Sequence, residues 1–356
     1  MKVNGTTAIG LKPRNQQIDA MKFLLILSIF IFHFETAAGN FYPFANTFQV
    51  EAFFAISGFW ALNKLKKPFL SSTFNSFKNY FIPWLIWVVI YTLYYTFSLS
   101  LGIRMMSDTF VKYFSAVRGT GIWGMWFTPL FFIITVFYTF ISKIFAKLFK
   151  VSDKILALIM FLFSFSIFFI CQYVVRIPAD LFFSIHLMPT YLLYFALGTF
   201  LYNWTCIFDC GKKASPAKKI IYPVISVASV LYLGIGYFQK TDILWGWTSD
   251  FLGGKLTFIP QILIVLAALF SFNFMAKYIS CDFTSKIGRK TLGLCHGEAF
   301  IKSVITLAAS LVGLQLKAKT PIEVIIMSFS ALILGGFIIV PAVNKFTDRL
   351  LMKNKS

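Results

Sequence analysis

FLLILSIFIFHF, residues Phe23 to Phe34, is an apolar run that contains one ionisable side chain, His33. Lys22 precedes the run, eleven residues before His33. At about 100° per residue, that spacing places Lys22 and His33 on one face of a helix, roughly 16 Å apart. An ionisable residue inside a membrane segment is costly and is by default functional. A histidine, which titrates near neutrality, also suits proton abstraction from a hydroxyl.

The rest of the chain repeats this apolar character. Of its 356 residues, 58% are hydrophobic, 19% aromatic and only 13% charged. A soluble domain does not need so much apolar surface, so we expect an all-α polytopic membrane protein with about ten transmembrane helices. Windows of about 20 residues give the spans Ala20–Ala38, Phe44–Leu62, Tyr80–Leu101, Met125–Ile141, Ile155–Val175, Leu187–Thr205, Ile220–Phe238, Leu256–Met275, Thr291–Val312 and Ile322–Val343.

We expect residues 1–356 to form a single domain, with a cytoplasmic leader at 1–19 and a cytoplasmic tail at 344–356. The net charge of +20 follows this topology. Most of the 33 Lys and Arg residues lie in alternate segments on the side of the N-terminus, as the positive-inside rule requires. Both termini are therefore predicted inside, and the charge does not indicate nucleic-acid binding. The Lys and Arg residues that lie outside the predicted inner segments are Arg104, Lys112, Arg118, Arg176, Lys240, Lys255, Lys302, Lys317 and Lys319.

Other sequence signals are weak. The five cysteines form neither a disulfide framework nor a metal pattern, so we expect no metal site. No short apolar core with a small-residue cleavage site opens the chain, so we expect the first span to be retained.

The second predicted span carries a carboxylate, Glu51, and a small-residue pair, Ser57 and Gly58. The loop before it is only about five residues, so the first two spans should be antiparallel neighbours. Entered from the outside, Glu51 is roughly 10 Å deep and His33 roughly 8 Å deep. We therefore expect Glu51 to orient His33 as the carboxylate partner of a general base. The alternative is that each side chain only reaches the nearby interface.

Three further features are candidate ligand contacts. Trp126, in GIWGMWFTPLFF, belongs either to an interfacial aromatic belt or to a stacking platform for a sugar or acyl chain. The lysines that follow the second span either only set orientation or also bind a cytoplasmic phosphate ligand. His296 lies near the inner side and has no assigned role. The lysines that follow the second predicted span are Lys64, Lys66, Lys67 and Lys78.

These motifs together resemble membrane acyltransferase family 3, which includes bacterial O-acetyltransferases of surface polysaccharides. RNQQIDAMKFLLILSIFIFH, from Arg14 to His33, matches the family's first helix, with its basic residue and histidine at Lys22 and His33. VEAFFAISGFW resembles the second-helix pattern of an acidic residue, a Phe pair and Ser-Gly. The later signatures are similar to KNYFIPWLIW, MWFTPLFF and IGRKTLGL.

The chain departs from the family pattern in two places. Lysines stand where the family often has arginines, at Lys22 and around Lys64 to Lys78, and a lysine cannot clamp a phosphate bidentately. The last signature usually ends in Tyr-Leu-x-His. Here Cys295 holds the tyrosine position and Glu298 the histidine position, with His296 two residues early.

The resemblance implies acyl transfer in a bacterial inner membrane, from cytoplasmic acetyl-coenzyme A to a hydroxyl of a glycan or lipid-linked glycan. His33 would be the base, supported by Glu51. Arg14, Lys22 and Lys78 would bind the donor, and Trp126 and Ser57 the substrate. Two other classes remain: a polysaccharide or lipid transporter or flippase, and a lipid-linked glycan polymerase, which the short outer loops disfavour. The acceptor sugar, the acyl chain and the oligomeric state are left open.

Overall fold

The computed structural model describes residues 15–100, 125–175, 177–178, 181–205, 216–238, 258–311, 313 and 318–351. These residues form helices and connecting turns, and no strand is found among them. The amino-terminal half contains α1 (Gln16–Phe32), η1 (Glu35–Ala38), α2 (Phe41–Asn46), α3 (Gln49–Gly58), η2 (Ala61–Lys66), α4 (Phe69–Ser76), η3 (Phe77–Phe81), α5 (Ile82–Ser100), α7 (Phe127–Phe149) and α8 (Asp153–Tyr173).

The carboxy-terminal half continues the helical pattern. It contains η4 (Phe182–Leu187), α9 (Met188–Trp204), α10 (Pro216–Phe238), α12 (Phe258–Ile279), α13 (Asp282–Gly288), α14 (Thr291–Leu311), α15 (Pro321–Leu334), η5 (Gly335–Ile339) and α16 (Val340–Leu350). The prediction of an all-α polytopic membrane protein is thus confirmed.

Seven helical stretches of the described residues are long and apolar enough to cross a membrane. They correspond to the fourth to tenth predicted spans. The first predicted span is α1, which has 17 residues, and the third is η3 followed by α5. The last stretch runs on to Arg349, so the predicted tail from 344 begins inside a helix. The total of ten spans and the side of each terminus remain predictions.

The second predicted span is interrupted. Helix α2 ends at Asn46, and α3 begins at Gln49 after Phe48, whose φ of −146° lies outside the helical region. The Thr47 hydroxyl donates to the Phe44 carbonyl inside this break. Helix α3 has only 10 residues and spans about 15 Å, half of a typical hydrocarbon core. Within the hydrocarbon region of a membrane, irregular backbone is tolerated where protein buries it or where it lines a cavity.

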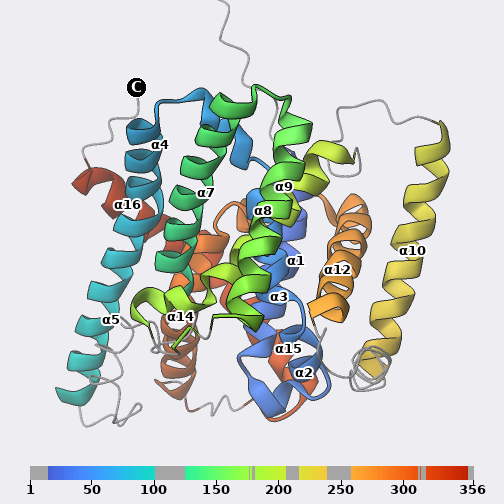
Figure 1. Cartoon of the computed structure of the whole chain (residues 1–356). Helices are drawn as coiled ribbons and strands as arrows, with labels where there is room; N and C mark the ends of the chain where they lie inside the picture. Colours follow the sequence, from blue (N-terminus) through green and yellow to red (C-terminus); the bar gives the residue numbers. More distant parts are fainter. Residues whose placement is uncertain are drawn as a thin grey trace, which may run out of the picture.

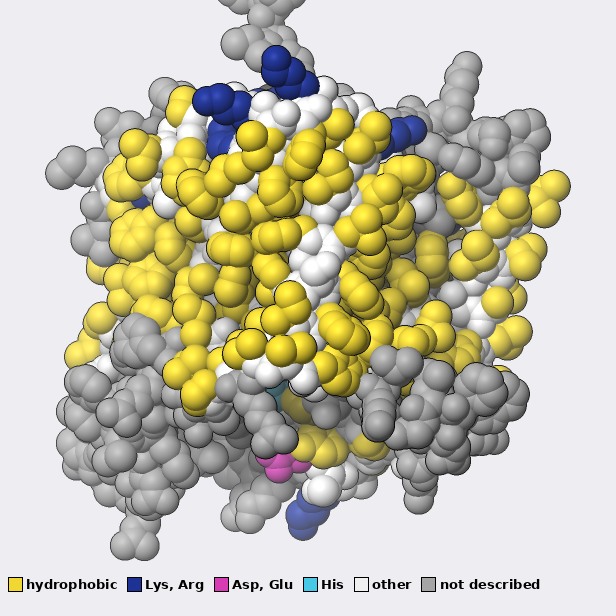
Figure 2. Space-filling model, viewed as in Figure 1, with side chains coloured by type: hydrophobic (Ala, Val, Ile, Leu, Met, Phe, Trp, Pro, Cys, Tyr) yellow, Lys and Arg dark blue, Asp and Glu magenta, His cyan; other side chains and the backbone are white. Residues whose placement is uncertain are grey.

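The outer surface agrees with a membrane environment. In Figure 2, apolar side chains cover most of the described part of the visible face, and most of its Lys and Arg side chains lie along the upper edge, although the lower edge also carries a basic side chain. Helices α4 and α16 lie at that upper end, whereas α2 lies at the lower end (Figure 1). Helix α10 stands at one side and exposes large apolar side chains, among them Ile220, Leu231 and Phe238. Lipid tails would cover such a surface.

Helix α1 occupies the centre of the molecule, where it contacts α3, α12, α13, α14 and α15. Close helix packing depends on glycines at two places. Gly288 of α13 sits against the Asp19 carbonyl, which a Cβ at that position would approach to 1.8 Å. Gly58 of α3 and Gly198 of α9 approach the backbones of Phe195 and Ala55 in the same way. Small residues allow such contact between membrane helices.

Candidate functional site

The first element of the site is the carboxy-terminal end of α1, which His33 caps. The His33 amide still donates to the Ile29 carbonyl at 3.1 Å, so the helix positions the residue although its own backbone leaves the helix. The His33 imidazole Nδ1 lies 2.8 Å from Oε2 of Glu298, on α14. The carboxylate that the structure pairs with His33 is therefore Glu298, rather than the predicted Glu51.

Glu298 also holds a cation. The Lys302 ammonium donates to Glu298 Oε1 at 2.6 Å and to the Phe30 carbonyl at 2.8 Å, and it lies 4.1 Å from the centre of the Phe34 ring. Glu298 is 1% exposed and Lys302 9%. A buried carboxylate is tolerated when it is paired and hydrogen-bonded. Because Lys302 already neutralises Glu298, the pair balances its own charge.

Glu298 also fixes the histidine tautomer. A carboxylate only accepts hydrogen bonds, so the 2.8 Å contact requires a proton on Nδ1 of His33. A neutral imidazole carries one N–H, and its lone pair then lies on Nε2. The arrangement can accept a proton at Nε2 and stabilise the resulting imidazolium through Glu298.

His33 and Glu298 open onto a cavity of about 200 Å³, which we call the outer cavity. Asn46 and Gln49, at the break between α2 and α3, line it with polar side chains, and the Gln49 Oε1 atom is buried without a hydrogen-bond partner in the described part of the chain. Trp126 and Tyr191 form its aromatic wall, with ring centres 5.6 Å apart. The remaining lining residues are Ile29, Phe32, Val50, Phe53, Phe127 and Cys295.

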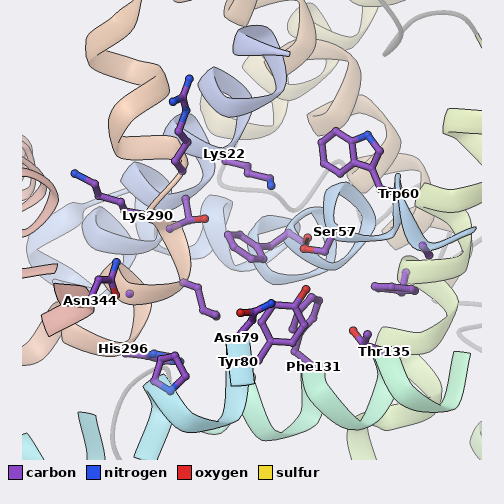
Figure 3. A pocket seen from close by; sticks show the side chains of 18 of the residues that line it. Lys22, Ser57, Trp60, Asn79, Tyr80, Phe131, Thr135, Lys290, His296 and Asn344 are labelled. Carbon is purple, nitrogen blue, oxygen red and sulfur yellow. Dashed lines mark hydrogen bonds between the residues drawn. The ribbon is translucent and has the colours of Figure 1, made fainter. Parts of the chain in front are cut away.

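A second, larger cavity of about 390 Å³, the inner cavity, is strongly basic (Figure 3). Lys22, Lys64, Arg289 and Lys290 all line it. No acidic side chain is among its lining residues, so the cavity suits an anion. Its other lining residues are Phe53, Ser57, Trp60, Ala61, Asn79, Tyr80, Pro83, Phe131, Thr135, Phe195, Thr291, Leu292, Gly293, His296 and Asn344.

The cations of the inner cavity are held in place by neighbours. The Lys22 ammonium lies 5.2 Å from the Trp60 ring centre, and Lys64 donates to the Ser76 hydroxyl at 3.3 Å. Arg289 bonds to the Asp19 carboxylate at 3.2 Å.

Desolvation changes the acidity of two of these cations. Burial lowers the pKa of Lys64 to about 8. Burial, and secondarily the charge of Lys286, also lower the pKa of Lys290. An anion in the cavity would favour the charged form of both.

The two cavities are neighbours, because Phe53 of α3 lines both. Helix α14 borders them as well: Cys295 and Glu298 line the outer cavity, and His296 lines the inner one. Phe53 therefore stands between the basic cavity and the chamber that holds His33.

The predicted site residues are divided between these cavities and other positions. Lys22 and Ser57 line the inner cavity, and His33 and Trp126 line the outer one. Glu51 is 8% exposed and accepts a hydrogen bond from Gln261 at 3.0 Å.

Lys78 and Arg14 complete the predicted set. The Lys78 ammonium lies over the Phe74 ring at 4.4 Å, and Lys78 is not among the lining residues of either cavity. Arg14 lies outside the described residues.

Sequence reasoning gave no role to Glu298, Lys302, Arg289 or Lys290. Two signals for them were present. Glu298 and Lys302 are four residues apart in a predicted span, a spacing that allows an ion pair on one helix face. The Arg289–Lys290 pair stands inside IGRKTLGL, a motif that was recognised without being assigned a ligand.

Comparison with known proteins gives one match. A family model described as an acyltransferase domain, acyltransferase family 3, matches residues 15–340 of the chain. No curated protein and no solved structure matches it.

Proposed function

The chain belongs to membrane acyltransferase family 3, and from this membership we propose that it transfers an acyl group, most simply acetyl, from a cytoplasmic coenzyme A thioester to a glycan hydroxyl. The acceptor would be a surface polysaccharide or lipid-linked glycan at a bacterial inner membrane. The observation that carries this proposal is the juxtaposition of a basic inner cavity and a histidine-containing outer cavity at Phe53.

The inner cavity is the proposed donor site. A coenzyme A thioester carries several phosphates at one end and a long neutral arm that ends in the acyl group. Cations favour binding of the phosphates, and Lys22, Lys64, Arg289 and Lys290 supply them. An arm directed past Phe53 would bring the thioester carbon toward His33.

The outer cavity is the proposed acceptor site. Sugar rings stack on aromatic side chains and offer many hydroxyl donors. Trp126 and Tyr191 supply the aromatic wall, and the unpartnered Gln49 Oε1 can accept a hydrogen bond from a hydroxyl. The 200 Å³ volume suits one sugar residue rather than a long glycan segment.

His33 is the proposed general base. Its Nε2 takes the proton of the acceptor hydroxyl while that oxygen forms a bond to the thioester carbon. The carbon–sulfur bond then breaks, and the imidazolium returns the proton to the departing thiolate. Glu298, bonded at Nδ1, orients the ring and stabilises the imidazolium between these steps.

The test uses membranes that contain the protein, radiolabelled acetyl-coenzyme A and the isolated glycan fraction. His33→Gln should lower acyl transfer by about 10² to 10⁴, the usual contribution of a positioned base, at unchanged protein level. His186→Gln is the matched control, because His186 lines neither cavity, and it should transfer normally. Near-normal transfer by His33→Gln would overturn the mechanism.

The donor site is tested by a pair of lysine variants. Lys22→Ala should raise the donor KM, by about tenfold or more for one charge-assisted phosphate contact, whereas Lys22→Arg should keep it low. Lys78→Ala should change the donor KM less, since Lys78 is not among the cavity-lining residues. Equal effects of Lys22→Ala and Lys78→Ala would contradict the assignment of the inner cavity.

A further inference from the structure

The His296 ring has no role in the mechanism above, yet it is held in an unusual position. His296 is fully buried and lines the inner cavity. Its Nε2 atom is bonded to the Thr128 hydroxyl, at the start of α7. Its Nδ1 atom is buried and has no hydrogen-bond partner in the part of the chain that the structure describes. A buried polar atom without a partner, on a residue that lines a cavity, requires an explanation, and a ligand group that reaches it would be one.

The Thr128 hydroxyl can donate to Nε2 or accept from it, so the contact is compatible with both tautomers of His296, and we take Thr128 as the donor. A hydroxyl can donate to the lone pair of a neutral imidazole nitrogen, and a neutral imidazole keeps its single N–H on the other nitrogen. With Thr128 donating to Nε2, the Nδ1 atom of His296 bears the hydrogen. The unpartnered atom is then a donor, and its natural partner is a carbonyl oxygen.

The surroundings hold the backbone of His296 in place. The His296 carbonyl accepts from the Tyr91 hydroxyl at 2.8 Å, and the same hydroxyl accepts from the Phe300 amide at 3.1 Å. Gly297, the next residue, lies against the Trp87 ring, which a Cβ there would approach to 2.5 Å. A donor fixed in this way needs no reorganisation when a partner arrives, which favours electrostatic catalysis.

His296 also lies on the side of α14 that faces the proposed donor site. Its helical neighbours Cys295 and Glu298 line the outer cavity, so α14 presents His296 to the donor side and the partner of His33 to the acceptor side. In Figure 3, Lys22 lies above Asn79 and Tyr80, and His296 lies to the left of them. A donor anchored by its phosphates near Lys22 would bring its acyl end toward His296.

We propose that His296 is a catalytic residue that donates a hydrogen bond from Nδ1 to the acyl carbonyl oxygen of the donor. This inference rests on the proposed function. When the acceptor oxygen, deprotonated by His33, bonds to the carbonyl carbon, the carbonyl electron pair moves onto its oxygen. His296 stabilises that oxyanion without losing its proton. The electron pair then reforms the carbonyl as the carbon–sulfur bond breaks and the thiolate takes the proton from His33.

The test compares variants that keep or remove the donor atom. His296→Leu should lower kcat by about 10² to 10³, the range for one oxyanion-hole donor, with the donor KM unchanged. His296→Asn, whose amide nitrogen stands near the place of Nδ1, should stay within about tenfold of the wild type. Thr128→Val removes the hydroxyl that fixes the tautomer and should give a smaller loss of kcat. Thr139→Val is the matched control, because Thr139 is a buried threonine of α7 that lines neither cavity, and it should leave kcat unchanged.

Binding of the donor is measured separately, with an S-ethyl thioether of coenzyme A, which has no acyl carbonyl. His296→Leu should bind this analogue as tightly as the wild type does. Weaker binding, or a kcat for His296→Leu within threefold of the wild type, would overturn the inference while wild-type transfer still supports the proposed function. Equal losses in His296→Asn and His296→Leu would also overturn it. Absence of transfer by the wild-type protein would instead refute the proposed function, and the inference with it.

Discussion

Glu298 is a carboxylate that is 1% exposed, and each of its two oxygens contacts a different side chain. Lys302 binds one oxygen at 2.6 Å and His33 lies 2.8 Å from the other. Removing one partner of a buried ion pair leaves an uncompensated charge, which is more costly than the pair itself is stabilising. Lys302 thus allows the carboxylate to remain ionised beside His33.

Lys302→Met should therefore destabilise the protein by about 3 to 5 kcal/mol, the usual cost of breaking a buried pair. Glu298→Gln combined with Lys302→Met removes both charges and should recover most of that loss, yet transfer should stay low because His33 has lost its carboxylate. Lys319→Met, at an exposed position, should change stability by less than about 0.5 kcal/mol. Thermal unfolding in detergent measures the three variants. A single variant Lys302→Met as stable as the wild type would contradict this account.

Lys64 gives the donor site a pH dependence. Because burial lowers the pKa of Lys64 to about 8, the side chain is mostly cationic at pH 7 and mostly neutral at pH 9. Phosphate binds the cationic form, so the donor KM should rise between these values, by up to about tenfold for loss of one charge-assisted contact. Lys290, whose pKa burial also lowers, titrates in the same direction.

The contribution of Lys64 is isolated by substitution. Lys64→Arg keeps its charge throughout this range, since the guanidinium pKa is above about 12, and should flatten the rise. Lys64→Met should show a raised donor KM already at pH 7. A rise in Lys64→Arg as steep as that of the wild type would assign the pH dependence to another group.

At the scale of helices, the sequence predicted α1 well and α3 poorly, for separate physical reasons. Periodicity alone places Lys22 and His33 on one helix, and the structure puts each of them in a cavity wall. The break at Thr47 was not predicted because the window around it is apolar on average despite Asn46 and Gln49, and hydropathy does not register a change of backbone direction. Glu298 was not assigned to His33 because 265 residues separate them, and such pairs are created only by tertiary packing.

Helix α3 carries Phe53, the residue that lines both cavities, and α3 packs closely against α9. A Cβ at Gly198 would lie 1.8 Å from the Ala55 carbonyl oxygen, and that obstacle is backbone that cannot rotate away. Gly198→Ala should therefore force the helices apart, lower the melting temperature in detergent and weaken acyl transfer, because Phe53 belongs to α3.

Gly234 of α10 provides the matched control for Gly198. Nothing lies within 4 Å of a Cβ at Gly234, so Gly234→Ala should be neutral or slightly stabilising, by at most about 1 kcal/mol, the helix preference of alanine over glycine. A melting temperature for Gly198→Ala equal to that of Gly234→Ala would show that the two helices are less tightly packed than the structure has them.

At the scale of the whole molecule, the two cavities are neighbours within the helical body, with Phe53 lining both. Most of the basic side chains of the visible face lie at the upper end, where α4 and α16 lie, and the break between α2 and α3 lies toward the other end (Figures 1 and 2). The cations of the inner cavity also come from segments that the charge pattern places inside. This asymmetry agrees with the predicted direction of insertion, which would place the basic cavity on the side of a cytoplasmic donor.

The predicted topology of ten spans with both termini inside is tested by alkaline phosphatase fusions, which are active only outside the cytoplasm. The decisive position is Asn40, between η1 and α2, because α1 and the short α3 must both cross for it to face outward while Lys66 faces inward. Since α3 alone spans only about 15 Å, α2 and η2 must complete its crossing. Fusions should be active after Asn40, Ser107, Asp250 and Lys317, and inactive after Lys66, Lys150 and Lys213. An active fusion after Lys66 would place the basic cavity outside, where no cytoplasmic donor could reach it.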